Sequence, residues 1–447
     1  RSREKTSHSD SSRRTLDSSH PAIRKRWRAA ARHTMNSVTR QLTRLAGEPF
    51  RLFFPLGVLA SVIGVMLWPA VFRGWIDYYP LEAHARWMVL GFGGSLVVGF
   101  LGTAGPRLLG TRPFFRWEFL VHLALALAMM TALWRNRIAA ADLLAGVWLT
   151  GVLASLLGRF PPARRDVPPP GLPLAVRGLG GAATAGIVFG SGISTSLPVH
   201  QLLRLLYFQG FLWLPILGVA PFLLPRFFGK PSPHSFDESL SIPPGWTRPF
   251  LESLAAGLLL LASFALEAWG HDRAGHVLRA VVVTLHLARS VPGLVAWGKV
   301  NGLGLALRWV VPCAAGGWLL AAWFQPLRIG MLHLMFIGGA GLLMFAAATR
   351  VILGHNERHD RLASPLKWWH AVWIMILFTA ATRLTSDFVP KVRVSHFIYA
   401  ALLWVVIAAF WSWKLRRERR LPVYEEGVIQ SRCPRRSKAS AGEPSRC

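Results

Sequence analysis

The sequence predicts an all-α membrane protein with about twelve transmembrane helices. Of its 447 residues, 52% are hydrophobic, and the mean hydropathy is +0.37 although both ends of the chain are very polar. A helix needs about 20 apolar residues to cross the hydrocarbon core of a bilayer. The chain between residues 50 and 414 contains twelve such stretches with no long polar segment between them, so any function must lie within the helix bundle or at its rims.

The twelve predicted segments follow one another with short connections. They are residues 52–72, 87–106, 117–134, 139–157, 174–194, 202–224, 249–269, 276–296, 303–323, 329–349, 368–385 and 395–413. The fifth segment contains the run RGLGGAATAGIVFGSG, residues 177–192. Small residues allow the backbones of two membrane helices to approach closely, so we expect this segment to pack tightly against a neighbour.

Basic tails flank the predicted membrane domain, residues 47–414. Residues 1–46 carry twelve Lys or Arg against three acidic residues, and residues 415–447 continue in the same Arg-rich style. Such compositions cannot form a packed core, so both tails are predicted to be disordered. The net charge of +30 therefore indicates contact with membrane lipid, and no nucleic acid partner is expected. The three cysteines indicate neither a disulfide framework nor a Cys-based metal site.

Lysine and arginine in the loops predict the orientation. Cytoplasmic loops of membrane proteins are enriched in these residues. With a cytoplasmic N-terminus, the inner loops contain RLLGTR, GRFPPARR, RFFGK and RVILGHNERHDR. An even number of helices returns the C-terminus to the same side. We therefore expect a multi-pass protein of the inner membrane with both termini in the cytoplasm.

Histidines are the candidate site residues, because an ionisable group in a membrane helix is costly unless it has a function or a partner. On this orientation, those near outer helix ends are His84, His200, His276, His333 and His396, whereas His286 lies near mid-depth and His122, His355 and His370 lie on the opposite rim. Imidazole is a common ligand of haem iron and copper. A single histidine at a helix end is also typical of an interfacial residue, but several at one depth favour a metal site.

Arginines accompany the outer histidines. His200 and Arg204 are four residues apart, and His276, Arg279 and His286 also share one helical face. Arg204 and Arg279 are thus candidates for pairing with the propionates of a haem, since Arg binds carboxylates in a bidentate manner. The alternative is that they pair with Glu267, Asp142 or backbone carbonyls.

The stretch RVILGHNERHDR at the inner rim has a partly structural explanation. Arg350 can extend its charged end to the interface, and Gly354 is predicted to end the helix in a left-handed cap. Neither reason explains His355, which follows directly.

Four blocks of the chain resemble the NnrS family. They are GEPFRLFFPLGVLAS (47–61), HARWMVLGFGGSLVVGFLGTAGPRLLGTRP (84–113), YFQGFLWLPILGVAPFLLPRFFG (207–229) and the stretch from Leu332 that ends in LGHNER at Arg358. The resemblance implies a bacterial twelve-helix membrane protein that binds haem and copper and is linked to nitric oxide metabolism and nitrosative stress. It also implies nitric oxide or an iron-nitrosyl species as a partner.

The resemblance carries particular residues over and leaves others unmatched. His84, His333 and His355 match metal-site histidines of the family pattern. Arg86 and Trp87 stand where that pattern has a second histidine and a glutamate. A site that needs both histidines lacks one ligand here.

Other classes of function remain open at this stage. Twelve helices and Gly-rich segments also suit a secondary transporter, although Glu252 and Glu267 lie near the ends of their helix and the helices contain few carboxylates. A relative of the haem-copper oxidases is less favoured, because no adjacent histidine pair occurs. Whether the protein turns over a substrate does not follow from these residues.

Overall fold

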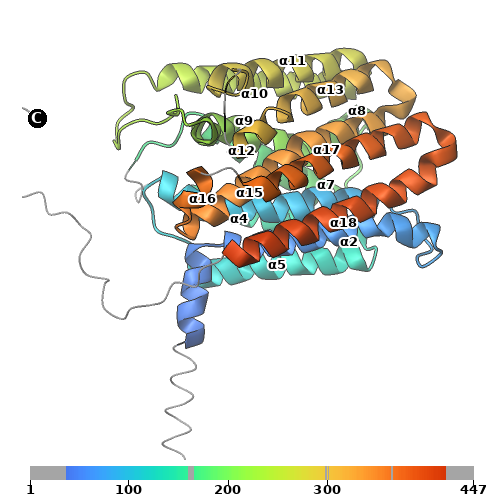
Figure 1. The fold of residues 1–447 in the computed structure, drawn as a ribbon, viewed down its shortest axis with the longest axis horizontal. Coiled ribbons are helices and arrows are strands. Elements are labelled where there is room, and N and C mark those ends of the chain that lie inside the picture. Colours follow the sequence, from blue (N-terminus) through green and yellow to red (C-terminus); the bar gives the residue numbers. More distant parts are fainter. Residues whose placement is uncertain are drawn as a thin grey trace, which may run out of the picture.

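The computed structural model describes residues 37–159, 166–296, 298, 300, 302–363 and 366–418 (Figure 1). This part of the chain is helical with loops and contains no β-strand, so the all-α prediction is confirmed. Residues 37–47, at the end of the predicted N-terminal tail, form a helix. Residues 1–36 and 419–447 lie outside the described residues, and their predicted disorder stays a prediction.

Eleven helices among the described residues are long and apolar enough to cross a membrane. Six of them are α2 (Phe50–Phe72), α5 (Arg116–Trp134), α6 (Ile138–Leu157), α7 (Leu172–Gly190), α10 (Thr247–Ala268) and α17 (Lys367–Phe388). The others combine shorter elements end to end. They are α3 (Leu81–Arg86), η1 (Trp87–Gly94) and α4 (Ser95–Leu108); α8 (Leu197–Leu205), η2 (Leu206–Gly210), α9 (Phe211–Leu223) and η3 (Leu224–Phe228); α12 (Gly302–Leu307) and α13 (Val310–Trp323); η4 (Gln325–Leu327), α14 (Arg328–His333), η5 (Leu334–Gly341) and α15 (Leu342–His355); and η6 (Pro390–Val392) and α18 (Arg393–Glu418).

The predicted segment 276–296 corresponds to α11 (Asp272–Ser290), which differs from the other eleven. It is long enough to cross a membrane but carries four charged residues, Asp272, Arg273, Arg279 and Arg289. It lies beside α10 and α13 (Figure 1). Four of its polar residues are buried, and two of these, His276 and Arg279, are fully so. Arg279 is paired with Glu267 on α10, which explains how so polar a helix packs within the bundle.

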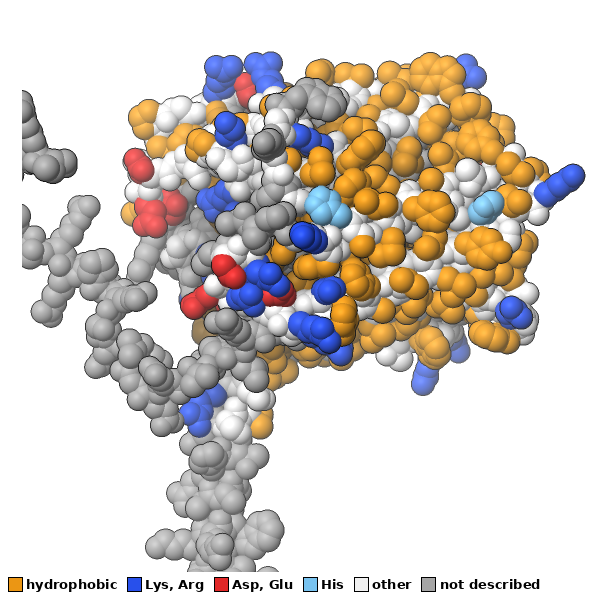
Figure 2. All heavy atoms as spheres, viewed as in Figure 1, with side chains coloured by type: hydrophobic (Ala, Val, Ile, Leu, Met, Phe, Trp, Pro, Cys, Tyr) orange, Lys and Arg blue, Asp and Glu red, His pale blue; other side chains and the backbone are white. Residues whose placement is uncertain are grey.

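The helices run roughly along the long axis of the molecule, and α2 begins at the same end of the bundle at which α18 finishes (Figure 1). We call this the terminal end, and the opposite one the far end. Figure 2 shows a broad hydrophobic surface between them, with most of the visible acidic and basic side chains at the terminal end. These features are those of a multi-pass membrane protein. Which side of the membrane the terminal end faces stays a prediction.

The small residues of α7 form the expected close helix contact. A Cβ atom added to Gly186 would lie 2.8 Å from the carbonyl oxygen of Asp142 and 2.9 Å from the backbone nitrogen of Gly146, both on α6. Backbone atoms cannot move aside as a side chain can. The close approach of α6 and α7 therefore depends on the absence of a side chain at this position.

We expect Gly186→Ala to destabilise the protein by about 1–3 kcal/mol, the usual cost of forcing an extra methyl group into a tight contact. Gly180→Ala, in the same helix, is the control, because its new Cβ would meet only Leu153 at 3.8 Å. That variant should be as stable as the wild type or slightly more stable, since Ala favours helix over Gly. Thermal unfolding in detergent checks both, and equal melting temperatures would contradict the packing argument.

Three of the long helices change their winding part of the way along. The segments η1, η2 and η5 are π-helical turns, in which hydrogen bonds reach one residue further than in an α-helix. Each one begins within three residues after a polar side chain, namely His84, Arg204 and His333. Such turns occur frequently at functional sites, and these polar residues line one cavity.

Candidate functional site

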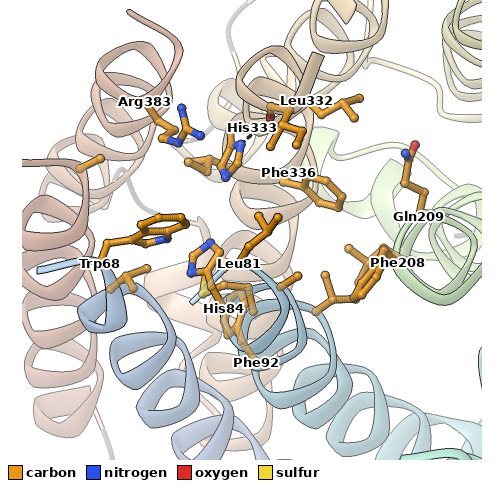
Figure 3. Close-up of a pocket in the computed structure, with 18 of the residues that line it drawn as sticks. Trp68, Leu81, His84, Phe92, Phe208, Gln209, Leu332, His333, Phe336 and Arg383 are labelled. Carbon is orange, nitrogen blue, oxygen red and sulfur yellow. Dashed lines mark hydrogen bonds between the residues drawn. The ribbon is translucent and has the colours of Figure 1, made fainter. Parts of the chain in front are cut away.

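A cavity of about 270 Å³ lies within the bundle toward the far end (Figure 3). Side chains from α2, α3, η1, α8, η2, α9, α10, α14, η5, α15, α17 and α18 line it, and most of them are apolar or aromatic. The polar residues of its wall are His84, Gln201, Arg204, Gln209, Glu267, Arg328, His333, Thr379 and Arg383. An apolar cavity with a few convergent polar groups is the usual form of a ligand or cofactor site.

His84 and His333 face each other across this cavity (Figure 3). Their ring centroids are 6.3 Å apart and their planes differ by 19°. The Nδ1 atom of His84 lies 2.9 Å from the carbonyl oxygen of Gly64, and that of His333 lies 2.7 Å from the carbonyl oxygen of Ile329. A carbonyl oxygen can only accept, so each Nδ1 carries the hydrogen. Each Nε2 of the neutral rings therefore keeps its lone pair.

This arrangement suits a metal ion held between two imidazoles. Bonds from a metal to imidazole nitrogen are about 2.0–2.1 Å long, so two rings with centroids 6.3 Å apart leave room for one ion when their Nε2 atoms point inward. A hydrogen bond from the second ring nitrogen is the usual way in which proteins orient a metal-binding histidine. The donor set and the aromatic walls fit a haem, whose iron His84 and His333 would hold.

Arginines stand around the histidine pair. Arg204 forms an ion pair with Glu82 at 2.9 Å, and Arg328 lies 3.7 Å from Asp272. Both guanidinium groups are partly exposed, which leaves donors for an anionic ligand. The cavity therefore combines two metal-ligand candidates with cations that can bind carboxylates.

Arg383 is a cavity residue that the sequence analysis missed. It donates to Ser386 Oγ at 2.7 Å and to Asp387 Oδ2 at 3.1 Å, and it lies over the ring of Phe397. Figure 3 shows it beside His333. The sequence held the signal, because Arg383 is the sole charged residue in the predicted segment 368–385, and such a residue is a site candidate by default.

Arg279, predicted as a propionate partner, lies outside the cavity lining. It is fully buried and donates to Glu267 Oε2 at 2.8 Å and to Gln209 Oε1 at 2.9 Å. Trp318 Nε1 also donates to Gln209 Oε1, at 3.0 Å. Pairing with Glu267 was the alternative expectation, and it is what the structure has. Arg279 thus reaches the cavity only through Glu267 and Gln209, which line it.

Two other predicted histidines also lie outside the cavity lining. His200 packs against Phe189, with ring centroids 4.9 Å apart. His286 has its Nε2 3.1 Å from the carbonyl oxygen of Leu217. The structure therefore brings together His84, His333 and Arg204 from the predicted set, but not His200, His286 or Arg279.

His355, the third histidine of the resemblance, lies at the terminal end. Arg107 donates to its Nε2 at 2.9 Å, so its Nδ1 hydrogen points to Glu48 Oε1, also at 2.9 Å. Burial alone would raise the pKa of Glu48, but hydrogen bonds from His355 and Arg51 lower that pKa to about 2. Both ring nitrogens of His355 have partners, and the ring connects α15 to α4 and to the turn that precedes α2.

The predicted cap at Gly354 is wrong. Helix α15 continues to His355, and the residue with left-handed backbone is Glu357, with φ of 56°. Glycine is favoured at such a position because it has no Cβ, but it is not required there. The turn thus comes three residues later than glycine alone suggests.

The residues present do not fit a copper site beside the histidine pair. Arg86, where the family pattern has its second histidine, makes two hydrogen bonds of 2.7 Å to the carboxylate of Asp142, and Tyr207 donates to Asp142 at 2.8 Å. All three side chains are buried. Within the residues that the structure describes, no group of three or more His, Cys, Asp or Glu could hold a metal ion.

We expect Arg86→His to lower stability by about 3–5 kcal/mol, because it leaves the Asp142 carboxylate buried without its cation. The copper content of the purified protein should not rise, since the new imidazole would sit beside that carboxylate and not in a ready ligand set. Elemental analysis and thermal unfolding measure the two outcomes. A stable variant with one bound copper per chain would show that Arg86 alone blocks a second metal site.

A family model described as NnrS protein matches residues 44–417 of the chain. The comparison with curated proteins gave no match. The matched region runs from before α2 to the last turn of α18 and includes every cavity residue named above, so the family assignment applies to the whole bundle. The chain belongs to the NnrS family.

Proposed function

We propose that this NnrS family protein binds haem in the far-end cavity and acts in nitric oxide metabolism or the response to nitrosative stress. The observation that carries the proposal is the pair of facing imidazoles, His84 and His333, each with its Nδ1 hydrogen bonded to a backbone carbonyl. That pairing leaves one free nitrogen lone pair on each of two neighbouring rings in the wall of a largely apolar cavity. A haem there supplies an iron centre that binds nitric oxide and exchanges electrons.

The protein's own residues have separate tasks in this proposal. His84 and His333 would hold the iron, and the contact of Trp68 with His84, at 5.7 Å between ring centroids, limits rotation of that ring. Arg204, Arg328 and Arg383, which line the cavity, would bind the propionates. Their existing carboxylate partners fix the direction of the guanidinium groups beforehand, so little side-chain entropy is lost on binding.

The apolar wall excludes water from the iron. Trp68, Phe92, Phe208 and Phe336 line the cavity (Figure 3), and a dry environment strengthens the electrostatic effect of the nearby fixed charges. Gln209 and Glu267 present polar groups that the buried Arg279 holds in place. The local electrostatics around the iron are thus set by groups that cannot rearrange freely.

The optical spectrum of the detergent-purified protein tests the proposal. Expression with a sufficient haem supply should give a Soret band at one haem per chain, with the spectrum of low-spin iron with two nitrogen ligands. Copper is not part of the proposal, because Arg86 stands in place of a histidine of the family pattern and forms an ion pair with Asp142. A protein that folds but contains no haem under these conditions would contradict the proposal.

The rival function, a secondary transporter, has less support. The carboxylate in the cavity wall, Glu267, is already neutralised by Arg279 at 2.8 Å. Proton coupling in a membrane helix usually needs an acid that can gain and lose its proton. If the Soret band is absent, transport assays in vesicles become the next experiment.

A further inference from the structure

A second cavity of about 110 Å³ lies between α2, α4, α9 and α15. Every described residue that lines it is apolar. Its wall includes Phe54, Leu96, Phe100, Ile216 and Ala348, and each of these is buried or half-buried. Polar ligands have no partner in such a space, and water gains too little there to enter it.

The second cavity adjoins the histidine cavity. Leu212 and Met344 line both of them. Gly93 lies where these two side chains meet, because a Cβ added to it would be 3.0 Å from Leu212 Cδ2 and 3.9 Å from Met344 Cε. The partition therefore consists of two flexible side chains over a glycine. Met is the most adaptable apolar side chain, with three rotatable bonds.

Size and chemistry decide what the second cavity can hold. An apolar cavity of about 150 Å³ in another protein stays dry and binds xenon or benzene. A space of about 110 Å³ accepts a smaller guest of the same kind. A diatomic gas has the required size and low polarity, and it dissolves readily in the bilayer around the bundle.

We propose that the second cavity is a holding site for a small apolar gas molecule, and that Leu212 and Met344 form the gate through which the molecule passes to the histidine cavity. The gas class rests on the proposed function, for which nitric oxide is the ligand. The route would bring such a ligand past apolar side chains, and not past the arginines in the wall of the histidine cavity. It enters from the apolar interior instead.

Xenon under pressure tests the holding site without any need for haem. A structure of the full chain in pressurised xenon should show an atom in the second cavity of the wild type. Ala348→Phe should remove it, because the phenyl ring fills the space, whereas Ala255→Phe, at an exposed position on α10, should not. If Ala348→Phe does not fold, Ala347→Phe places the ring in the same cavity from the next residue.

Gas rebinding tests the gate in the haem-loaded protein. After flash photolysis of the carbon monoxide complex, Ala348→Phe should slow bimolecular rebinding by about tenfold, which equals about 1.4 kcal/mol of added barrier. Gly93→Ala, which narrows the partition, should slow it as well. Ala255→Phe should rebind like the wild type.

The two proposals fail in different ways. Absence of xenon from the wild-type cavity, an acyl chain found in its place, or wild-type rebinding in Ala348→Phe would overturn the holding site while the Soret band persists. Absence of the Soret band would overturn haem binding, and the xenon result would still decide whether the second cavity accepts apolar gases.

Discussion

Alanine at either His84 or His333 is expected to weaken haem binding by at least about 100-fold, because the loss of outer-shell groups alone costs metal sites roughly 10–100-fold. Each variant removes one of the two nitrogen donors that face the cavity. Haem that remains bound should show the spectrum of iron with a single strong axial ligand. Titration of the haem-free protein with haem measures the affinity, and the Soret region reports the ligand change.

The controls for this experiment come from histidines that the structure places elsewhere. His200→Ala and His286→Ala should bind haem as the wild type does, since neither residue lines the cavity. His355→Ala should also keep its haem, because that ring pairs with Glu48 and Arg107 at the terminal end. Normal haem content in the double variant His84→Ala/His333→Ala would rule out this pair as the iron ligands.

Arg279→Met is expected to destabilise the protein by about 3–5 kcal/mol, the usual cost of breaking a buried ion pair from one side. The variant leaves the Glu267 carboxylate, 5% exposed, without its cation. It also removes the donor that Gln209 faces at 2.9 Å. Reversible unfolding in mixed micelles measures the change in the free energy of unfolding.

Two controls test whether the loss of stability in Arg279→Met comes from the unpaired charge or from lost packing. One is a double variant and the other is an exposed ion pair. Arg279→Met/Glu267→Leu should recover much of the loss, since an apolar pair of similar volume often replaces a buried ion pair without penalty. Arg248→Met breaks an exposed pair with Glu252 and should cost less than about 1 kcal/mol. A loss at Arg279 no greater than that at Arg248 would show that the buried network contributes little to stability.

The membrane architecture could be predicted from the sequence because a bilayer imposes simple rules on length and hydropathy. The predicted segment 276–296 corresponds to α11. By composition this helix is not among those apolar enough to cross a membrane, yet it packs against α10 and α13 within the bundle. Helix α11 stays in the bundle because its polar groups have buried partners, such as the contact of Arg279 with Glu267 on α10. A hydropathy average cannot detect this, since the partner belongs to another helix.

The candidate site could be predicted in part. The depth of a histidine in its helix follows from residue number, and this placed His84 and His333 at one level. Depth does not give the direction in which a side chain points around the helix axis. His200 and His276 also lie near outer helix ends by residue number, yet the cavity wall includes neither of them. Only the packing of the helices separates the two groups.

The choice between partners of Arg279 shows the same limit. The sequence offered a cofactor carboxylate and Glu267 as alternatives, and both are reasonable for a buried guanidinium. The residues are twelve positions apart on consecutive helices, α10 and α11, so their contact depends on how these helices turn back on each other. The spacing of residues along one helix does not reveal how two consecutive helices pack against each other.

The π-helical turn η1 begins three residues after His84 along the same helix. A turn of this kind holds one more residue than the α-helical turn that it replaces, and each residue of an α-helix advances by about 100° around the axis. Loss of a single residue between Trp87 and Gly94 would therefore leave the helix intact but swing His84 by more than a quarter of a circle, away from His333. The pairing of these imidazoles therefore depends on the one extra residue of the π-helical turn. That residue acts through the length of the backbone and not through its side chain.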